Sequence, residues 1–145
     1  MNKEAQNYWN EYWGDQVKPT SVSAWKFGDT TDRLAEQVVS GVKTATCSGH
    51  VFYELENMSL PKADEYGVIL NSEDQPVAIV KTVEVSIIPM NEVTEEFAIA
   101  EGDGTYENWR NIHVKYFSAE LQKYGITFKE DMLLVCERFK LINIK

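Results

Sequence analysis

The feature that most constrains the fold is a long run of β-branched and apolar residues, Val77–Ile88. Val, Ile and Thr suit the pleated, half-buried surface of a sheet, and Pro89 ends the run because proline cannot donate to a strand ladder. A shorter apolar segment, Tyr66–Leu70, precedes it, and turn-forming residues fill Asn71–Pro76 between the two. This spacing predicts a β-hairpin.

Shorter segments surround the hairpin without a regular strand–helix–strand rhythm. Three further strands are predicted: Val22–Phe27, Thr44–Cys47 and Met132–Ile144. Predicted helices cover Ala5–Trp13, a segment with Leu34, Val38 and Val39 on its buried face, Thr94–Ala100 and a long stretch between Thr105 and Gly125. Val51–Leu55 fits either a strand or a helical turn, and we favour the turn. The order of elements predicts an α+β fold with a mostly antiparallel sheet or a small barrel.

The N-terminal helix carries an aromatic stripe, in which Tyr8, Trp9, Tyr12 and Trp13 recur at helical spacing. We expect residues 1–18 to form an amphipathic helix that packs on a domain spanning 19–145, because an apolar stripe on a helix usually faces a core. The alternative is a subunit contact in a homodimer, since Trp and Tyr are enriched in interface hot spots.

Composition narrows the functional classes. The 145 residues suffice for one domain with a real core, and a formal charge of −9 opposes binding to a long polyanion. No apolar run approaches the roughly 20 residues needed to cross a bilayer, and no signal peptide is recognised. Two cysteines in apolar segments predict free thiols and a cytoplasmic location. Without paired Cys and His spacing, no zinc site or cofactor is expected.

The segment Gly41–Thr46 combines a turn with functional side chains. Lys43 and Thr46 are three residues apart, so a continuous strand would send them to opposite faces. They can converge only if Lys43 lies on the turn and the strand begins after it. A lysine could then activate the hydroxyl or stabilise an oxyanion. The alternative is a solvated surface lysine beside an edge threonine, which spacing alone favours.

Other candidates lie elsewhere in the chain. Glu101 precedes two glycines on a loop that can approach a ligand, where it could act as a general base or orient the lysine. Alternatively it is a solvated acid near the dipole of the following helix. His113 adjoins the apolar stripe of that helix, which favours packing or hydrogen bonding over catalysis. Trp25 and Phe27 could stack on a base, although core packing is the alternative role.

Gly41–Thr46 resembles the GxKxxT signature of the ASCH domain family, of the longer bacterial single-domain type. The resemblance extends in order along the chain, through Phe27–Asp29, Leu60–Lys62, Glu84–Val85, Phe97–Ala98, Glu101–Asp103, Trp109–Arg110, His113 and Val135–Phe139. It implies a PUA-like fold, a small, mostly antiparallel β-barrel with flanking helices, to which this chain adds an N-terminal helix.

The resemblance also implies a function connected with RNA or a modified nucleoside. Some short bacterial members are amidohydrolases that deacylate N4-acetylcytidine with a lysine, a threonine and a glutamate, and longer members are linked to ribonuclease activity. By position these catalytic roles transfer to Lys43, Thr46 and Glu101. The predicted ligand-binding residues are Trp25, Phe27, Thr44, Arg110 and His113.

Two departures from the family pattern shape the expected ligand. The shortest members lack the N-terminal helix, and Val42 stands where many relatives carry a basic residue. Together with the charge of −9, this favours a nucleoside or short RNA over a long duplex, with no membrane partner. The alternatives are a noncatalytic RNA-binding module and a small-ligand sensor or interaction domain.

Overall fold

The computed structural model describes residues 1–145, and its five strands form one sheet in the order β1-β3-β4-β5-β2. The strands are β1 (Val22–Trp25), β2 (Ala45–Gly49), β3 (Tyr66–Leu70), β4 (Pro76–Pro89) and β5 (Leu133–Ile144). Only β1 and β3 pair in parallel, and every other neighbouring pair is antiparallel. The predicted α+β class with a mostly antiparallel sheet is confirmed, and β3 and β4 form the predicted hairpin.

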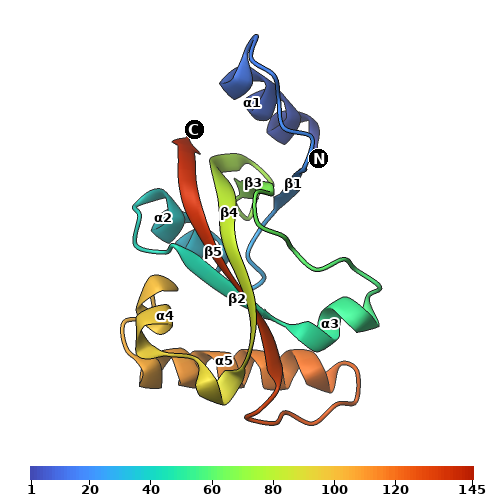
Figure 1. Cartoon of the computed structure of the whole chain (residues 1–145), viewed down its shortest axis with the longest axis vertical. Helices are drawn as coiled ribbons and strands as arrows, with labels where there is room; N and C mark the ends of the chain where they lie inside the picture. Colours follow the sequence, from blue (N-terminus) through green and yellow to red (C-terminus); the bar gives the residue numbers. More distant parts are fainter.

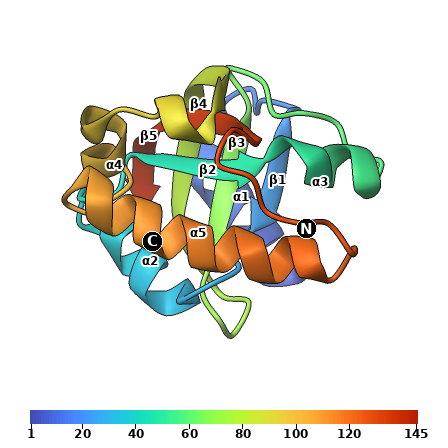
Figure 2. The same ribbon diagram turned by 90° about the horizontal axis from the view of Figure 1, so that it is seen from below.

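Helices cover the sheet from several sides. They are α1 (Lys3–Trp13), α2 (Thr31–Val39), α3 (His50–Leu55), α4 (Glu95–Ala100) and α5 (Tyr106–Gln122), with a 3-10 turn at Met90–Glu92. Figure 1 shows α1 at one end of the sheet and α5 across the other, and Figure 2 shows the length of α5 below the strands. The helical interpretation of Val51–Leu55 is confirmed by α3. No helix combines the length and apolar character needed to span a membrane.

The two long strands give the sheet its curvature. β4 pairs with β5 along nearly its whole length, and the register between them shifts after Ile79 and after Thr82. Such irregularities bend a strand and increase its twist. β1 and β2 remain at the two edges of the sheet, so the barrel-like arrangement is open along one side.

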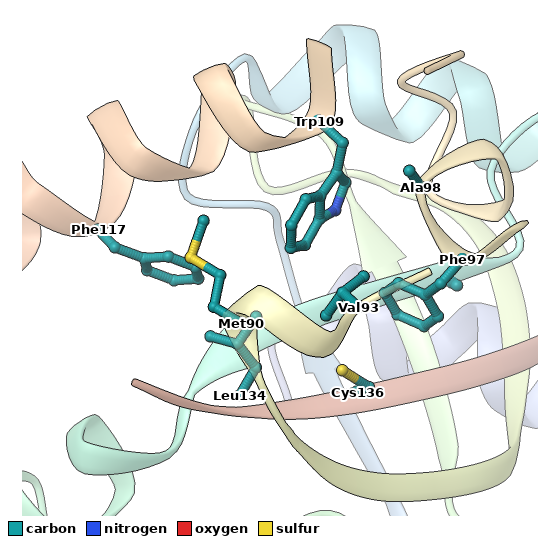
Figure 3. Close-up of a cluster of buried hydrophobic side chains, with 9 residues drawn as sticks. Met90, Val93, Phe97, Ala98, Trp109, Phe117, Leu134 and Cys136 are labelled. Atoms are coloured by element: carbon teal, nitrogen blue, oxygen red, sulfur yellow. The ribbon is translucent and has the colours of Figure 1, made fainter. Parts of the chain in front are cut away.

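The core beneath α4 and α5 supports the candidate site. Trp109 and Phe117 descend from α5 onto Leu134 and Cys136 of β5, together with Val93 from the preceding segment (Figure 3). Trp109 and Leu134 are completely inaccessible to solvent. Large aromatic side chains contribute much of the apolar area that a core buries. This cluster therefore fixes α5 against the sheet.

The aromatic stripe of α1 packs on the opposite end of the domain. Ala5, Tyr8 and Trp9 are buried against Val68, Leu70 and Ile79 of β3 and β4. The hydroxyl of Tyr8 donates to the side-chain oxygen of Asn143 at 2.8 Å, which ties α1 to the end of β5. The central part of the stripe therefore belongs to the core of the same chain.

Candidate functional site

The segment between α2 and β2 is held by its backbone. Gly41 adopts a left-handed conformation with φ of 82°, which glycine tolerates at little cost. The amide of Lys43 then donates to the carbonyl of Gln37 at 3.0 Å, and the amide of Thr44 donates to that of Ala100 at 2.7 Å. These bonds bring the turn against the C-terminus of α4. Lys43 therefore lies before the strand, which begins at Ala45.

Lys43 meets Glu101 in the interior of the protein. Its ammonium donates to the backbone carbonyl of Glu101 at 3.1 Å and to carboxylate oxygen Oε1 at 3.4 Å. Only 4% of Lys43 and 2% of Glu101 is accessible to solvent. The ammonium also lies 5.4 Å from the ring centre of Phe27. The interpretations of Lys43 as a surface lysine and Glu101 as a solvated acid are wrong, because the turn and the end of α4 fold onto each other.

The second carboxylate oxygen of Glu101 is held from α5. The indole Nε1 of Trp109 donates to Oε2, so both oxygens of the buried carboxylate accept hydrogen bonds. Hydrogen bonds to an ionised group are stronger than neutral ones and fix its orientation. Sequence periodicity placed Trp109 on the apolar face of α5, which is correct. It gave no sign that the indole nitrogen would serve a carboxylate.

His113 lies one turn further along α5 and stacks on Trp109, with ring centres 4.5 Å apart. Its Nδ1 lies 2.7 Å from the backbone carbonyl of Trp109, which can only accept, so Nδ1 carries a proton. Its Nε2 faces Oε2 of Glu101 at 3.5 Å. Asp103 lies on the other side, 4.0 Å from Nδ1. This histidine both packs within the helix and adjoins the candidate acid.

These groups open onto a cavity of about 230 Å³. The side chains that line it include Lys43, Thr46, Cys47, Glu101, Asp103 and His113. The structure therefore brings Lys43, Thr46 and Glu101, predicted from three separated positions, to one cavity. A buried ammonium beside a held carboxylate and a free hydroxyl can stabilise an oxyanion and transfer a proton in the same space.

Two groups at the cavity, the carboxyl group of Asp103 and the thiol of Cys47, have raised pKa values. Burial, followed by the negative charge of Glu101, raises the pKa of Asp103. Burial also raises the pKa of the Cys47 thiol well above its ordinary value, and Glu101 again adds to the effect. Both shifts arise because a charged form loses its water next to an existing negative charge. Cys47 is therefore a neutral thiol at the cavity wall.

Cys47, Glu101 and His113 place their ligand atoms within 4.8 Å of one another, a grouping that could hold a metal ion. The surrounding contacts do not fit one. Metal ligation requires a thiolate, whereas the pKa of Cys47 is raised, and both oxygens of Glu101 already accept from Lys43 and Trp109. The ammonium of Lys43 also repels a cation. The arrangement favours a polar ligand.

The other predicted ligand-binding residues separate into two groups. Phe27 and His113 line the cavity, and Trp25 lines a neighbouring groove. Thr44 is exposed and contributes through its backbone, and Arg110 pairs with Glu130 beside a different depression. Neither Thr44 nor Arg110 lines the cavity, because Thr44 is exposed just before β2 and Arg110 pairs with Glu130 in the loop before β5. Sequence reasoning missed Cys47 and Asp103 as wall residues.

The groove is larger, about 510 Å³, and shares Phe27, Gly28, Thr46, Cys47 and Tyr116 with the cavity. Its wall includes residues from all five strands, among them Trp25, Gly67, Val80, Glu137, Phe139 and Thr46. Because β1 and β2 are opposite edges of the sheet and both line it, the groove lies along the open side of the barrel. The cavity and the groove adjoin each other at Thr46, which lines both, and together they form one candidate site.

A family model and a solved structure agree on one family. The model of the ASCH domain matches residues 23–143. Protein EF3133 from Enterococcus faecalis, of the DUF984 family, is 43% identical, with a TM-score of 0.83 over 96% of this chain and 85% of that one. An ASCH domain from Lactobacillus crispatus is 31% identical, with a TM-score of 0.90 over 97% and 95%.

A ZmASCH mutant protein from Zymomonas mobilis is 12% identical, with a TM-score of 0.50 over 84% of this chain and 73% of that one, and this likeness concerns the fold alone. A search of curated proteins returned no match.

Proposed function

Because the chain belongs to the ASCH domain family, we propose that its cavity binds a modified nucleoside and hydrolyses an N-acyl bond of N4-acetylcytidine type. One observation carries this proposal: the buried pair of Lys43 and Glu101 opens onto a cavity that Thr46 also lines. A buried ion pair is costly to desolvate, so it is weak evidence for stability. It is better explained by a reaction in which charge develops and a proton moves.

Each side chain has a role that fits its contacts. None of the hydrogen bonds of Glu101 goes to Thr46, so we assign the attack to a water molecule rather than to the threonine. Thr46 orients this water, and Glu101 takes its proton as the oxygen attacks the acyl carbon. Lys43 has three N–H donors and directs two at Glu101, which leaves one for the oxyanion.

The tetrahedral intermediate then breaks its bond to the exocyclic nitrogen. Glu101 returns the proton to that nitrogen, and the products are cytidine and acetic acid, which ionises to acetate by releasing its proton to the solvent. Trp109 holds Glu101 throughout this exchange. Nε2 of His113 faces the same carboxylate oxygen at 3.5 Å, so a ring with its proton on Nδ1 can accept from Glu101 while Glu101 carries the proton.

The test is release of acetate from N4-acetylcytidine by the full-length protein. We expect the wild-type protein to release acetate. In Glu101→Gln and in Lys43→Met we expect kcat to fall at least a hundredfold, as it does when one preorganised electrostatic group is removed. Lys62→Met is a matched control, because Lys62 is exposed and lies outside the cavity. Wild-type protein that releases no acetate would contradict the proposal.

A second experiment decides whether the substrate is a free nucleoside or a nucleoside within RNA. The charge of −9 opposes a long polyanion, so the free nucleoside is the expected substrate. The same assay with an acetylated RNA oligonucleotide gives the comparison. Faster turnover of the oligonucleotide at low salt would assign the substrate to RNA, whereas salt-sensitive RNA binding without acetate release would indicate a noncatalytic module.

A further inference from the structure

Glu137 is a half-buried carboxyl group that the proposed reaction does not use. It lies on β5 and its register partner on the edge strand β2 is Thr46. Directly opposite residues on antiparallel strands point to the same face, with side chains about 5 Å apart. Glu137 lines the groove, so its carboxyl group is next to the point where the groove meets the cavity.

No cation of the groove neutralises Glu137. Lys26 is the only lysine or arginine on the groove wall, and its ammonium pairs with Asp74 at 2.8 Å. The one charge that acts on its pKa is negative, that of Glu65 before β3. The other titratable groups on the wall are Cys47, Tyr53, Tyr66 and Tyr116, and none of them is a cation.

These surroundings favour the uncharged form. Burial, followed by the negative charge of Glu65, raises the pKa of Glu137 to about 7. A neutral carboxyl group offers one O–H donor beside one carbonyl acceptor, whereas the ionised group can only accept. The two forms therefore recognise different partners. The neutral form matches an edge with an acceptor beside a donor, such as N3 and the N4–H of cytosine, and the ionised form matches two donors, as in guanine.

The groove can also hold a flat ring. Trp25 is half-buried on its wall, and the indole passes over Gly67, where any Cβ would lie 2.6 Å from Nε1. Gly67 thus makes room for the tryptophan to lie against the sheet. Aromatic side chains stack on bases of any kind, because every base has a π-face. A ring stacked there would present one edge to the sheet.

We infer that Glu137, as a neutral carboxylic acid, binds the donor–acceptor edge of a pyrimidine base in the groove, next to the acyl group that the cavity receives. This inference rests on the proposed function for the identity of the reacting group. The binding of the base by Glu137 does not depend on that reaction and can be tested without it. It assigns the base to the groove and the acyl group to the cavity, with Thr46 at their junction. Glu137 becomes a residue that determines specificity.

The first test measures the equilibrium binding of cytidine and of guanosine to the full chain. Calorimetry gives both affinities at about pH 6 and at about pH 8. In the wild type we expect cytidine to bind more tightly than guanosine and to weaken as Glu137 ionises at the higher pH. In Glu137→Gln the amide supplies a permanent donor and acceptor, so cytidine affinity should not change with pH. In Glu137→Met affinity should fall about tenfold, within the range for loss of a paired base contact. Glu73→Gln, in the exposed turn before β4, is the charge-matched control.

Unchanged cytidine affinity in folded Glu137→Met would overturn the inference, as would preferential guanosine binding that strengthens with pH. The second test separates this result from the proposed function. If Glu137-dependent cytidine binding occurs without acetate release from N4-acetylcytidine, the reaction is wrong and the inference holds. If acetate is released but Glu137→Met leaves KM unchanged, the reaction holds and the inference is wrong.

Discussion

The ammonium of Lys43 lies 3.1 Å from the backbone carbonyl oxygen of Glu101 and 3.4 Å from its carboxylate, across 58 residues of sequence. The contact depends on the amide of Thr44, which donates to the carbonyl of Ala100 at 2.7 Å and fixes the two segments together. The reactive groups are therefore positioned by main-chain bonds of their immediate neighbours. Such support holds a charged pair in place before any ligand arrives.

Breaking this pair should destabilise the fold. Lys43→Met leaves the buried carboxylate of Glu101 without its cation, at an expected cost of about 3–5 kcal/mol. The double variant Lys43→Met/Glu101→Gln leaves no unpaired charge and should lose less than the single Lys43 variant. Urea denaturation of the wild type, both single variants and the double variant measures these effects. Additive losses would mean that the two side chains do not interact.

The hydroxyl of Thr46, rather than the bulk of its side chain, should matter for turnover. Thr46→Ser keeps the hydroxyl and should retain most of kcat for N4-acetylcytidine, whereas Thr46→Val keeps the shape and should lose at least tenfold. Thr44→Val is the matched control, because Thr44 is exposed and outside the cavity. Equal activity in Thr46→Val and the wild type would remove Thr46 from the mechanism.

The indole N–H of Trp109 should contribute to stability beyond the packing of its ring. Trp109→Phe leaves the buried Oε2 of Glu101 without this donor, which should cost about 1–3 kcal/mol beyond the loss of packing. Trp13→Phe removes the same group elsewhere, and the Nε1 of Trp13 is buried without a partner. Urea denaturation should show a clearly larger loss for Trp109→Phe. Equal losses would indicate that Trp109 acts by packing alone.

Both cysteines should react slowly in the folded protein. They are free thiols, and burial raises the pKa of Cys136 to about 12 and that of Cys47 well above its ordinary value. Since the thiolate is the reactive form, alkylation by iodoacetamide near pH 7.5 should be at least tenfold slower than for a free cysteine. Mass spectrometry measures the extent of labelling, and unfolding in urea should make both cysteines react at the rate of a free cysteine. Rapid modification of native Cys47 would contradict its assignment as a neutral thiol.

Stability should fall with rising pH because of Glu137. Its pKa is raised from an ordinary value of 4.5 to about 7 in the folded protein. Between these values the folded state keeps a proton that the unfolded chain has lost, so the free energy of unfolding decreases as pH rises and levels off above the folded pKa. Glu137→Gln removes this contribution. Urea denaturation at about pH 5 and about pH 8 should show a smaller decline in the variant, and identical declines would contradict the raised pKa.

Local patterns in the sequence determined the elements. The β-branched run up to Ile88 produced β4, the helical spacing of aromatic residues produced α1 and α5, and Thr105 caps α5 by accepting from the amide of Asn108. These features depend on backbone preferences and periodicity within a few residues. The ordered resemblance to the ASCH family identified Lys43, Thr46 and Glu101 as candidates, although their spacing could not show that they meet.

Tertiary structure alone decided their environment. The fold buries Lys43 and Glu101 as a pair whose contacts are fixed, although both are charged side chains of the kind that usually lie at the surface. The same fold leaves Thr44 and Arg110 outside the cavity. The register of β2 against β5 placed Glu137 beside Thr46, which no local pattern in either strand encodes. Protonation and reactivity depend on which charges and how much water surround a group. That surrounding is assembled from segments far apart in the chain.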